Sequence, residues 1–128
     1  MKKIMIIVVD DNLVGRLLPS FILRPFSTLV QVLECECGAD ALRLMGIHHV
    51  THVLLDICMP VMDGVKVAQQ MRAVSKYSEV RLIAYTANAQ VADVAYLKSV
   101  GFDDVLLKPI KSAELLHALD ILVPDQHA

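Results

Sequence analysis

The sequence lacks the charge and the apolar length that mark several common classes of protein. Its formal net charge is only −2, so it has no long-range attraction for nucleic acid or anionic lipid. The apolar run at residues 4–9 ends at two aspartates and is too short for a signal-peptide core or a membrane span. We therefore expect a cytoplasmic protein that binds neither nucleic acid nor membranes.

Cysteine and metal-binding histidine patterns are also sparse. The three cysteines cannot all pair with one another, and Cys35 and Cys37 lie at the end of a predicted strand, so we expect reduced, partly buried thiols. His48, His49 and His52 would need further ligands and a suitable geometry to hold a metal ion, which their loop does not offer. A polar loop before a strand is the favoured interpretation.

No repeat, low-complexity tract or linker rich in Pro, Gly and Ser divides the 128 residues. We expect one domain at residues 1–123 and a short tail at 124–128, because this length can bury a single core. Apolar residues make up 55% of the chain, which fits a sheet covered on both faces.

Apolar runs alternate with helical patterns along the whole chain. The predicted strands lie near 3–9, 29–35, 51–56, 80–86 and 104–107, and the predicted helices at 13–25, 38–47, 63–76, 89–99 and 112–122. This strict alternation predicts an α/β fold, a doubly wound five-stranded parallel sheet with five alternating helices on its two faces and right-handed crossovers.

Two of the predicted helices contain irregular features. Pro19 removes a backbone donor inside the first helix, so we expect a kink there. In the fourth helix, Val91, Val94 and Ala95 suffice for a stripe that faces the core, which leaves Ala92 and Tyr96 outside.

Charged and hydroxyl side chains stand where four of the predicted strands end, namely Asp10 with Asp11, Asp56, Thr86 and Lys108. In an open α/β sheet, ligands bind at the carboxyl ends of the strands. Each feature alone has a structural interpretation, since an Asp pair can form a cap or turn and a Lys-Pro pair can end a strand. Their joint occurrence, in this order, favours a single site.

The residue types at these strand ends fit a particular chemistry. Clustered carboxylates resist ionising together unless a cation shares the site, and Mg²⁺ prefers such oxygen ligands. Lys108 supplies a compact positive charge, and Thr86 supplies a hydroxyl donor. A carboxylate nucleophile, a divalent cation, an ammonium and a hydroxyl are the parts needed for phosphoryl transfer to an aspartate.

Four segments resemble the receiver domains of two-component response regulators, which include the chemotaxis regulator. They are residues 8–12 (VVDDN), 56–64 (DICMPVMDG), 85–89 (YTANA) and 108–109 (KP). The resemblance covers essentially the whole chain. It implies a flavodoxin-like fold with strand order 2-1-3-4-5.

The resemblance also implies roles for individual residues. Asp56 would accept a phosphoryl group from a phosphohistidine on a sensor histidine kinase or a histidine phosphotransferase. Mg²⁺ would be held by Asp56, by Asp11 directly, by Asp10 through water, and by the backbone carbonyl of Cys58. Thr86 and Lys108 would hold the phosphoryl oxygens.

Phosphorylation in this family changes the face formed by the fourth helix, the fifth strand and the fifth helix, which could then bind an effector protein or a second copy. Many receivers place an aromatic ring three residues before the active-site lysine, where this chain has Val105. Tyr85 and Tyr96 are alternative reporters, although we expect Tyr85 to be packed in the core. Cys58 and Asn88, at positions that flank the phosphate in receivers, are uncharged, so we expect slow to moderate self-dephosphorylation.

The favoured interpretation is a signalling switch that catalyses only its own phosphorylation and dephosphorylation. One alternative is a degenerate receiver used for protein interaction or dimerisation, although such chains usually lose residues that this one keeps. The other is a phosphohydrolase of the haloacid dehalogenase type. That class needs a carboxylate two residues after the nucleophile, where this chain has Cys58.

Overall fold

The computed structural model describes residues 3–58, 64–87 and 93–121. The strands are β1 (Ile4–Val9), β2 (Val30–Cys35), β3 (His52–Asp56), β4 (Arg81–Thr86) and β5 (Asp104–Leu107). The helices are α1 (Leu13–Leu23), α2 (Gly38–Ile47), α3 (Gly64–Arg72), α4 (Val94–Val100) and α5 (Ser112–Ala118), with 3₁₀ turns at Arg24–Phe26 and Ser75–Tyr77. The strands pair in parallel in the order β2-β1-β3-β4-β5, which confirms the predicted fold.

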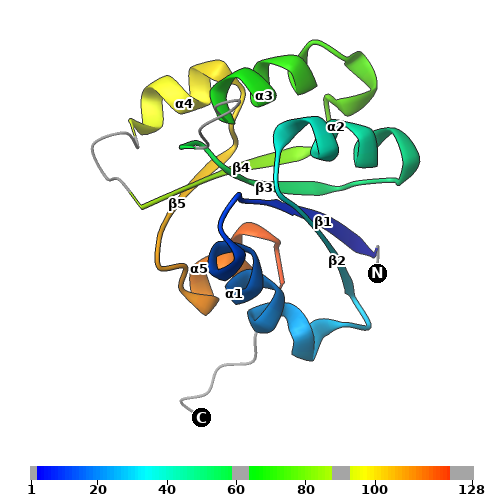
Figure 1. Ribbon diagram of the computed structural model, residues 1–128, viewed down its shortest axis with the longest axis vertical. Helices are drawn as coiled ribbons and strands as arrows, with labels where there is room; N and C mark the ends of the chain where they lie inside the picture. The colour runs from blue at the N-terminus through cyan, green and yellow to red at the C-terminus, as the bar shows by residue number, and fades with distance from the viewer. Residues whose placement is uncertain (1–2, 59–63, 88–92, 122–128) are drawn as a thin grey trace.

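Helices cover both faces of the sheet, with α1 and α5 on one face and α2, α3 and α4 on the other (Figure 1). Side chains of β1 alternate between two cores, because successive residues of a strand point to opposite faces. Ile7 and Val9 pack into the core under α2, α3 and α4, and Ile6 and Val8 pack into the core under α1 and α5. The sheet is therefore buried on both faces, as the apolar composition indicated.

The third helix is shorter than predicted. It ends at Arg72 rather than at residue 76, and a separate 3₁₀ turn follows at Ser75–Tyr77. The guanidinium of Arg72 donates to the carbonyls of Tyr77 and Gly101, each at 3.0 Å, and to Asp103 Oδ2 at 2.9 Å. The side chain of Arg72 thus ties the end of α3 to the 3₁₀ turn and to the segment before β5.

The core stripe predicted for the fourth helix was wrong. Asp93 caps the N-terminus of α4 by accepting a hydrogen bond from the backbone N–H of Tyr96 at 3.1 Å, so the helix begins at Val94. With this start, Leu97 faces the core, whereas Val94 is 47% exposed and Ala95 is also exposed. Tyr96 is exposed as predicted, and Val91 and Ala92 are outside the described residues.

The first helix continues through its proline. α1 spans Leu13–Leu23 with Pro19 buried inside it, and the predicted kink stays a prediction. The three cysteines are free thiols; Cys35 is buried and Cys37 partly buried, whereas Cys58 is exposed rather than partly buried as expected. None of the described helices has the length and apolar character needed to cross a membrane.

Candidate functional site

Three carboxylates meet at the carboxyl ends of β1 and β3. These strands are neighbours, with Val9 opposite Leu55, so the residues that follow or end them lie side by side. Asp10 is fully buried, Asp56 is 6% exposed and Asp11 is exposed. Their carboxylate oxygens lie within 4.8 Å of one another.

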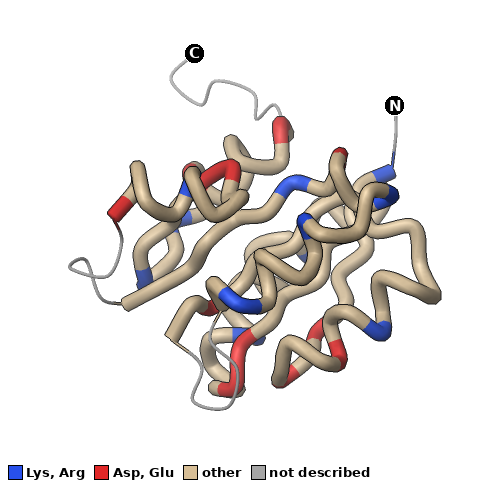
Figure 2. Tube along the Cα trace, turned by 90° about the horizontal axis from the view of Figure 1, so that it is seen from above, with Lys and Arg blue, Asp and Glu red and all other residues tan. Residues whose placement is uncertain are grey.

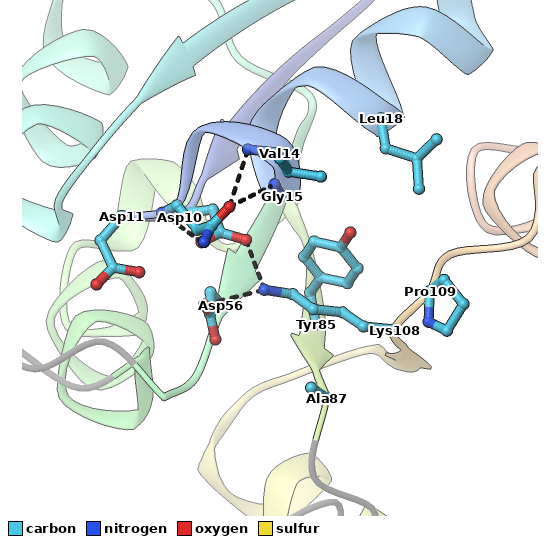
Figure 3. Close-up of a pocket in the computed structure, with 11 residues that line it drawn as sticks. Asp10, Asp11, Val14, Gly15, Leu18, Asp56, Tyr85, Ala87, Lys108 and Pro109 are labelled. Carbon is cyan, nitrogen blue, oxygen red and sulfur yellow. Dashed lines mark hydrogen bonds and ion pairs between the residues drawn. The ribbon is translucent and has the colours of Figure 1, made fainter.

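Lys108 joins this group from the loop after β5 (Figure 3). Its Nζ donates to Asp10 Oδ2 at 2.6 Å and to Asp56 Oδ2 at 3.3 Å. Its backbone N–H donates to the carbonyl of Thr86 at 2.8 Å, which ties the loop to the end of β4. Burial alone would lower the pKa of Lys108, but the hydrogen bond that its ammonium donates to Asp10 and the nearby charge of Asp56 raise it overall.

The surroundings of Asp56 disfavour the ionised form of its carboxyl group. Burial raises the pKa of its carboxyl, and the charge of Asp10 raises it further. A hydrogen bond from the backbone N–H of Cys58 at 2.9 Å and the ammonium of Lys108 act in the opposite direction. A cation at this cluster would favour the ionised carboxylate, so the donor set fits a hard divalent ion such as Mg²⁺.

The start of α1 holds Asp10 in place. The backbone N–H of Asn12 donates to Asp10 Oδ1 at 2.9 Å, while the Asn12 side chain caps the helix by accepting from the backbone N–H of Val14 at 2.9 Å. The Arg16 guanidinium donates to the backbone carbonyl of Asp10 at 2.9 Å. A Cβ atom on Gly15 would overlap Asp10 Oδ2, so only glycine allows this approach. Sequence reasoning missed Gly15, because nothing local reveals its distance from the carboxylate.

Thr86 is buried at the end of β4, where its Oγ1 lies 3.5 Å from Sγ of Cys58. Cys58 itself is exposed. The structure therefore brings Asp10, Asp11, Asp56 and Lys108 together and places Thr86 beside Cys58. Asn88, whose position was expected to affect phosphate hydrolysis, lies outside the described residues.

A cavity of about 500 Å³ opens beside the carboxylates (Figure 3). It is lined by Asp10, Asp11, Asn12, Val14, Gly15, Leu18, Asp56, Tyr85, Ala87, Lys108 and Pro109. The ring of Tyr85 is packed in the core, as predicted, and its centroid lies 4.7 Å from Nζ of Lys108. Val105, at the position where an aromatic was missing, is partly buried against the core under α2, α3 and α4.

Among the described residues, His48, His49 and His52 belong to no group of ligating side chains close enough to hold an ion. Within the ranges that the structure describes, the cluster of Asp10, Asp11 and Asp56 is the only group of three or more ligating side chains close enough to hold an ion.

Basic residues are spread over several elements, with no continuous basic stripe in the described chain (Figure 2).

Most of the chain, including this site, matches a known protein family. Residues 6–120 match the family model of the response regulator receiver domain. The chain belongs to this family. A receiver is a signalling module of two-component systems, and the pocket of Asp10, Asp11 and Asp56 fits a phospho-accepting aspartate with Mg²⁺. Neither alternative, the degenerate receiver or the phosphohydrolase, is favoured.

Several relatives resemble this receiver. The Regulator of RpoS of Escherichia coli is 35% identical over 119 residues, which are 91% of this chain but 33% of that protein, so the chain spans about a third of its length. Over 86% of this chain and 7% of its own length, the hybrid signal transduction histidine kinase L of Dictyostelium discoideum is 34% identical.

Two solved structures give the same fold. The receiver domain of a sensor histidine kinase from Pseudomonas aeruginosa, solved with a magnesium ion coordinated in its active-site cleft, has a TM-score of 0.80 and 31% identity, and covers 92% of this chain and 95% of that one. A chemotaxis response regulator of Vibrio cholerae has a TM-score of 0.81 and 24% identity, covering 93% of this chain and 98% of that one, and supports the fold alone.

Proposed function

We propose that this receiver works in a phosphorelay, in which Asp56 accepts a phosphoryl group from a histidine of a sensor histidine kinase or a histidine phosphotransferase. One observation carries the proposal: Asp56 lies close to two further carboxylates and to the ammonium of Lys108. The Nζ atom of Lys108 is 3.3 Å from Asp56 Oδ2. A cytoplasmic location accords with such partners.

The proposed ligands of Mg²⁺ are the carboxylates of Asp10, Asp11 and Asp56 and the backbone carbonyl of Cys58, with Asp11 binding directly and Asp10 through water. When bound, Mg²⁺ would neutralise the charge on the phosphoryl oxygens and on the crowded carboxylates. The closeness of the three carboxylates supports this set, because hard oxygen donors within 4.8 Å of one another match its preference.

The transfer itself is carried by side chains of this protein. A carboxylate oxygen of Asp56 forms a bond to phosphorus as the N–P bond of the phosphohistidine breaks, and the electron pair of that bond stays on the imidazole nitrogen. Lys108 already lies between Asp10 and Asp56, so its ammonium can follow the new phosphoryl oxygens with a small displacement. Thr86 would donate its hydroxyl to another of these oxygens.

The proposed output is a change in the face formed by α4, β5 and α5. Movement of Thr86 toward the acyl phosphate would alter the end of β4, which pairs with β5 through Thr86 and Leu107. Tyr96 and Leu107 are 52% and 46% exposed on these elements, and such apolar surface suits an effector protein or a second copy. The switch would be a shift between two arrangements that both exist before phosphorylation.

Phosphorylation by a small acyl phosphate, such as acetyl phosphate, tests the proposal without knowledge of the partner. With Mg²⁺, the wild-type protein should gain the mass of one phosphoryl group, and Asp56→Asn should gain none. Asp40→Asn is a matched control, because Asp40 is a partly exposed carboxylate in the first turn of α2. Phosphorylated Asp56→Asn, or a wild-type protein that stays unmodified, would contradict the proposal.

A further inference from the structure

Tyr85 is the residue of β4 that lies directly beside Asp56. The two are opposite each other in the pairing of β3 with β4, and the carbonyl of Tyr85 accepts a hydrogen bond from the backbone N–H of Ile57 at 3.2 Å. Successive strand residues point to opposite faces. Thr86 therefore reaches Cys58 on one face, whereas the ring of Tyr85 lies on the other face, in the core under α1 and α5.

On that face the ring of Tyr85 meets the ammonium of Lys108. The distance from Nζ to the ring centroid is 4.7 Å, within the range of a cation–π contact. Tyr85 is 1% exposed, so its ring is held by the core, whereas the side chain of Lys108 is 21% exposed. The ammonium is thus bounded by the ring of Tyr85 together with the carboxylates of Asp10 and Asp56 (Figure 3).

These contacts would not respond equally to phosphoryl transfer. Both carboxylates that hold Lys108 are proposed to bind Mg²⁺, and Asp56 also becomes the acyl phosphate, so their attraction for the ammonium changes during the reaction. The ring of Tyr85 takes no part in that chemistry. A lysine side chain is flexible, so its charged end can move. The fixed contact with the ring therefore matters most for the position of the ammonium when Asp10 and Asp56 are engaged by Mg²⁺ or by the phosphoryl group.

We propose that Tyr85 is a positioning residue, whose ring holds the ammonium of Lys108 where the incoming phosphoryl oxygens will lie. This inference rests on the proposed function. It assigns the effect to the ring rather than to the hydroxyl, which points away from Asp56 in Figure 3. A phenylalanine at position 85 should therefore keep the positioning role of Tyr85, whereas a side chain without a ring should lose it.

The test compares Tyr85→Phe, Tyr85→Leu and the control Ile83→Val in the full chain. Ile83 lies two residues earlier on β4 and is fully buried in the same core. One readout is the rate of phosphorylation by acetyl phosphate with Mg²⁺. The other is the upfield ring-current shift of the ε-methylene protons of Lys108, measured by NMR in the metal-free protein, which reports the ring without requiring activity.

We expect Tyr85→Phe to keep the ring-current shift and a phosphorylation rate within about twofold of wild type. Tyr85→Leu should lose the shift and be phosphorylated about five- to tenfold more slowly, the range of a partly desolvated cation–π contact. Ile83→Val should lower the melting temperature while both readouts stay at wild-type values. If Tyr85→Leu does not fold by circular dichroism, Tyr85→Met removes the ring with a more adaptable side chain.

A Tyr85→Leu protein that is phosphorylated at the wild-type rate would overturn the inference. So would a Tyr85→Phe protein as slow as Tyr85→Leu, since that result would assign the effect to the hydroxyl. A slow rate in Ile83→Val would show that loss of core packing alone is sufficient, and would also overturn it. If the wild-type protein accepts no phosphoryl group, the proposed function fails first, and this outcome is distinct from the others.

Discussion

The thiol of Cys58 lies 3.5 Å from the hydroxyl of Thr86, on the side of the site that faces solvent. Cys58 is two residues after the proposed acceptor Asp56, yet its side chain carries no carboxylate that could remove a proton from an attacking water. A phosphoryl group on Asp56 would therefore be bordered by an uncharged side chain at this position.

We predict that the phosphorylated wild-type protein loses its phosphate slowly and that Cys58→Asp loses it about tenfold faster, because a carboxylate can orient and activate water. Cys58→Asn is the control, since it has nearly the same shape as aspartate without its charge. Decay of the phosphoprotein can be followed by mass spectrometry after the phosphodonor is removed. A wild-type half-life of seconds, or equal decay in the Asp and Asn variants, would count against this prediction.

Gly15→Ala should favour the helix but weaken Mg²⁺ binding. Alanine is favoured over glycine inside a helix by about 0.5–1 kcal/mol, but the added methyl group would push the Asp10 carboxylate away from Lys108. We expect Mg²⁺ to bind at least about tenfold more weakly. Gly46→Ala in α2 is the control, because its new methyl group meets open space and should only stabilise the protein. Titration calorimetry and thermal melts measure the two effects, and unchanged Mg²⁺ affinity in Gly15→Ala would refute the prediction.

Stability should fall in mild acid because of His52. Burial lowers the pKa of this imidazole from 6.5, the charge of Arg81 lowers it further, and Nε2 has no hydrogen-bond partner. Below pH 6.5 the unfolded chain binds a proton that the folded protein does not, so the free energy of unfolding decreases as pH falls toward the folded pKa. Above pH 6.5 the contribution of His52 to stability is fully present.

Denaturant unfolding at several pH values checks this expectation. The decrease should be smaller in His52→Asn than in the wild type, and His49→Asn, which alters an exposed histidine of the same region, should behave like the wild type. The same slope in His52→Asn as in the wild type would exclude this histidine as the cause.

Mg²⁺ should stabilise the folded protein through Asp56. Because burial raises the pKa of Asp56, its ionised form is costly in the metal-free protein at neutral pH. Asp56→Asn should therefore melt at a higher temperature than the wild type in EDTA, and gain less when Mg²⁺ is added. Asp40→Asn should respond to Mg²⁺ as the wild type does. If Mg²⁺ raises the melting temperature of Asp56→Asn as much as that of the wild type, Asp56 is not a ligand.

Local sequence patterns were sufficient for much of the fold. Buried strands appear as apolar runs whatever their neighbours, so the five strands were predicted to within a residue or two. The helices were harder. At the end of α3, the guanidinium of Arg72 reaches Gly101 and Asp103, and α4 begins at the cap formed by Asp93. These contacts depend on residues that a helical pattern of apolar positions does not include.

The sequence by itself determined which charged and hydroxyl groups stand at the carboxyl ends of the strands, because a parallel sheet brings those ends to one edge. Only the tertiary structure decided how they meet. Asp10 and Lys108 are 98 residues apart, yet their charged atoms lie 2.6 Å apart, and the ring of Tyr85 is 4.7 Å from the same ammonium. Such distances depend on the packing of loops and helix ends against the sheet, which involves the whole chain at once.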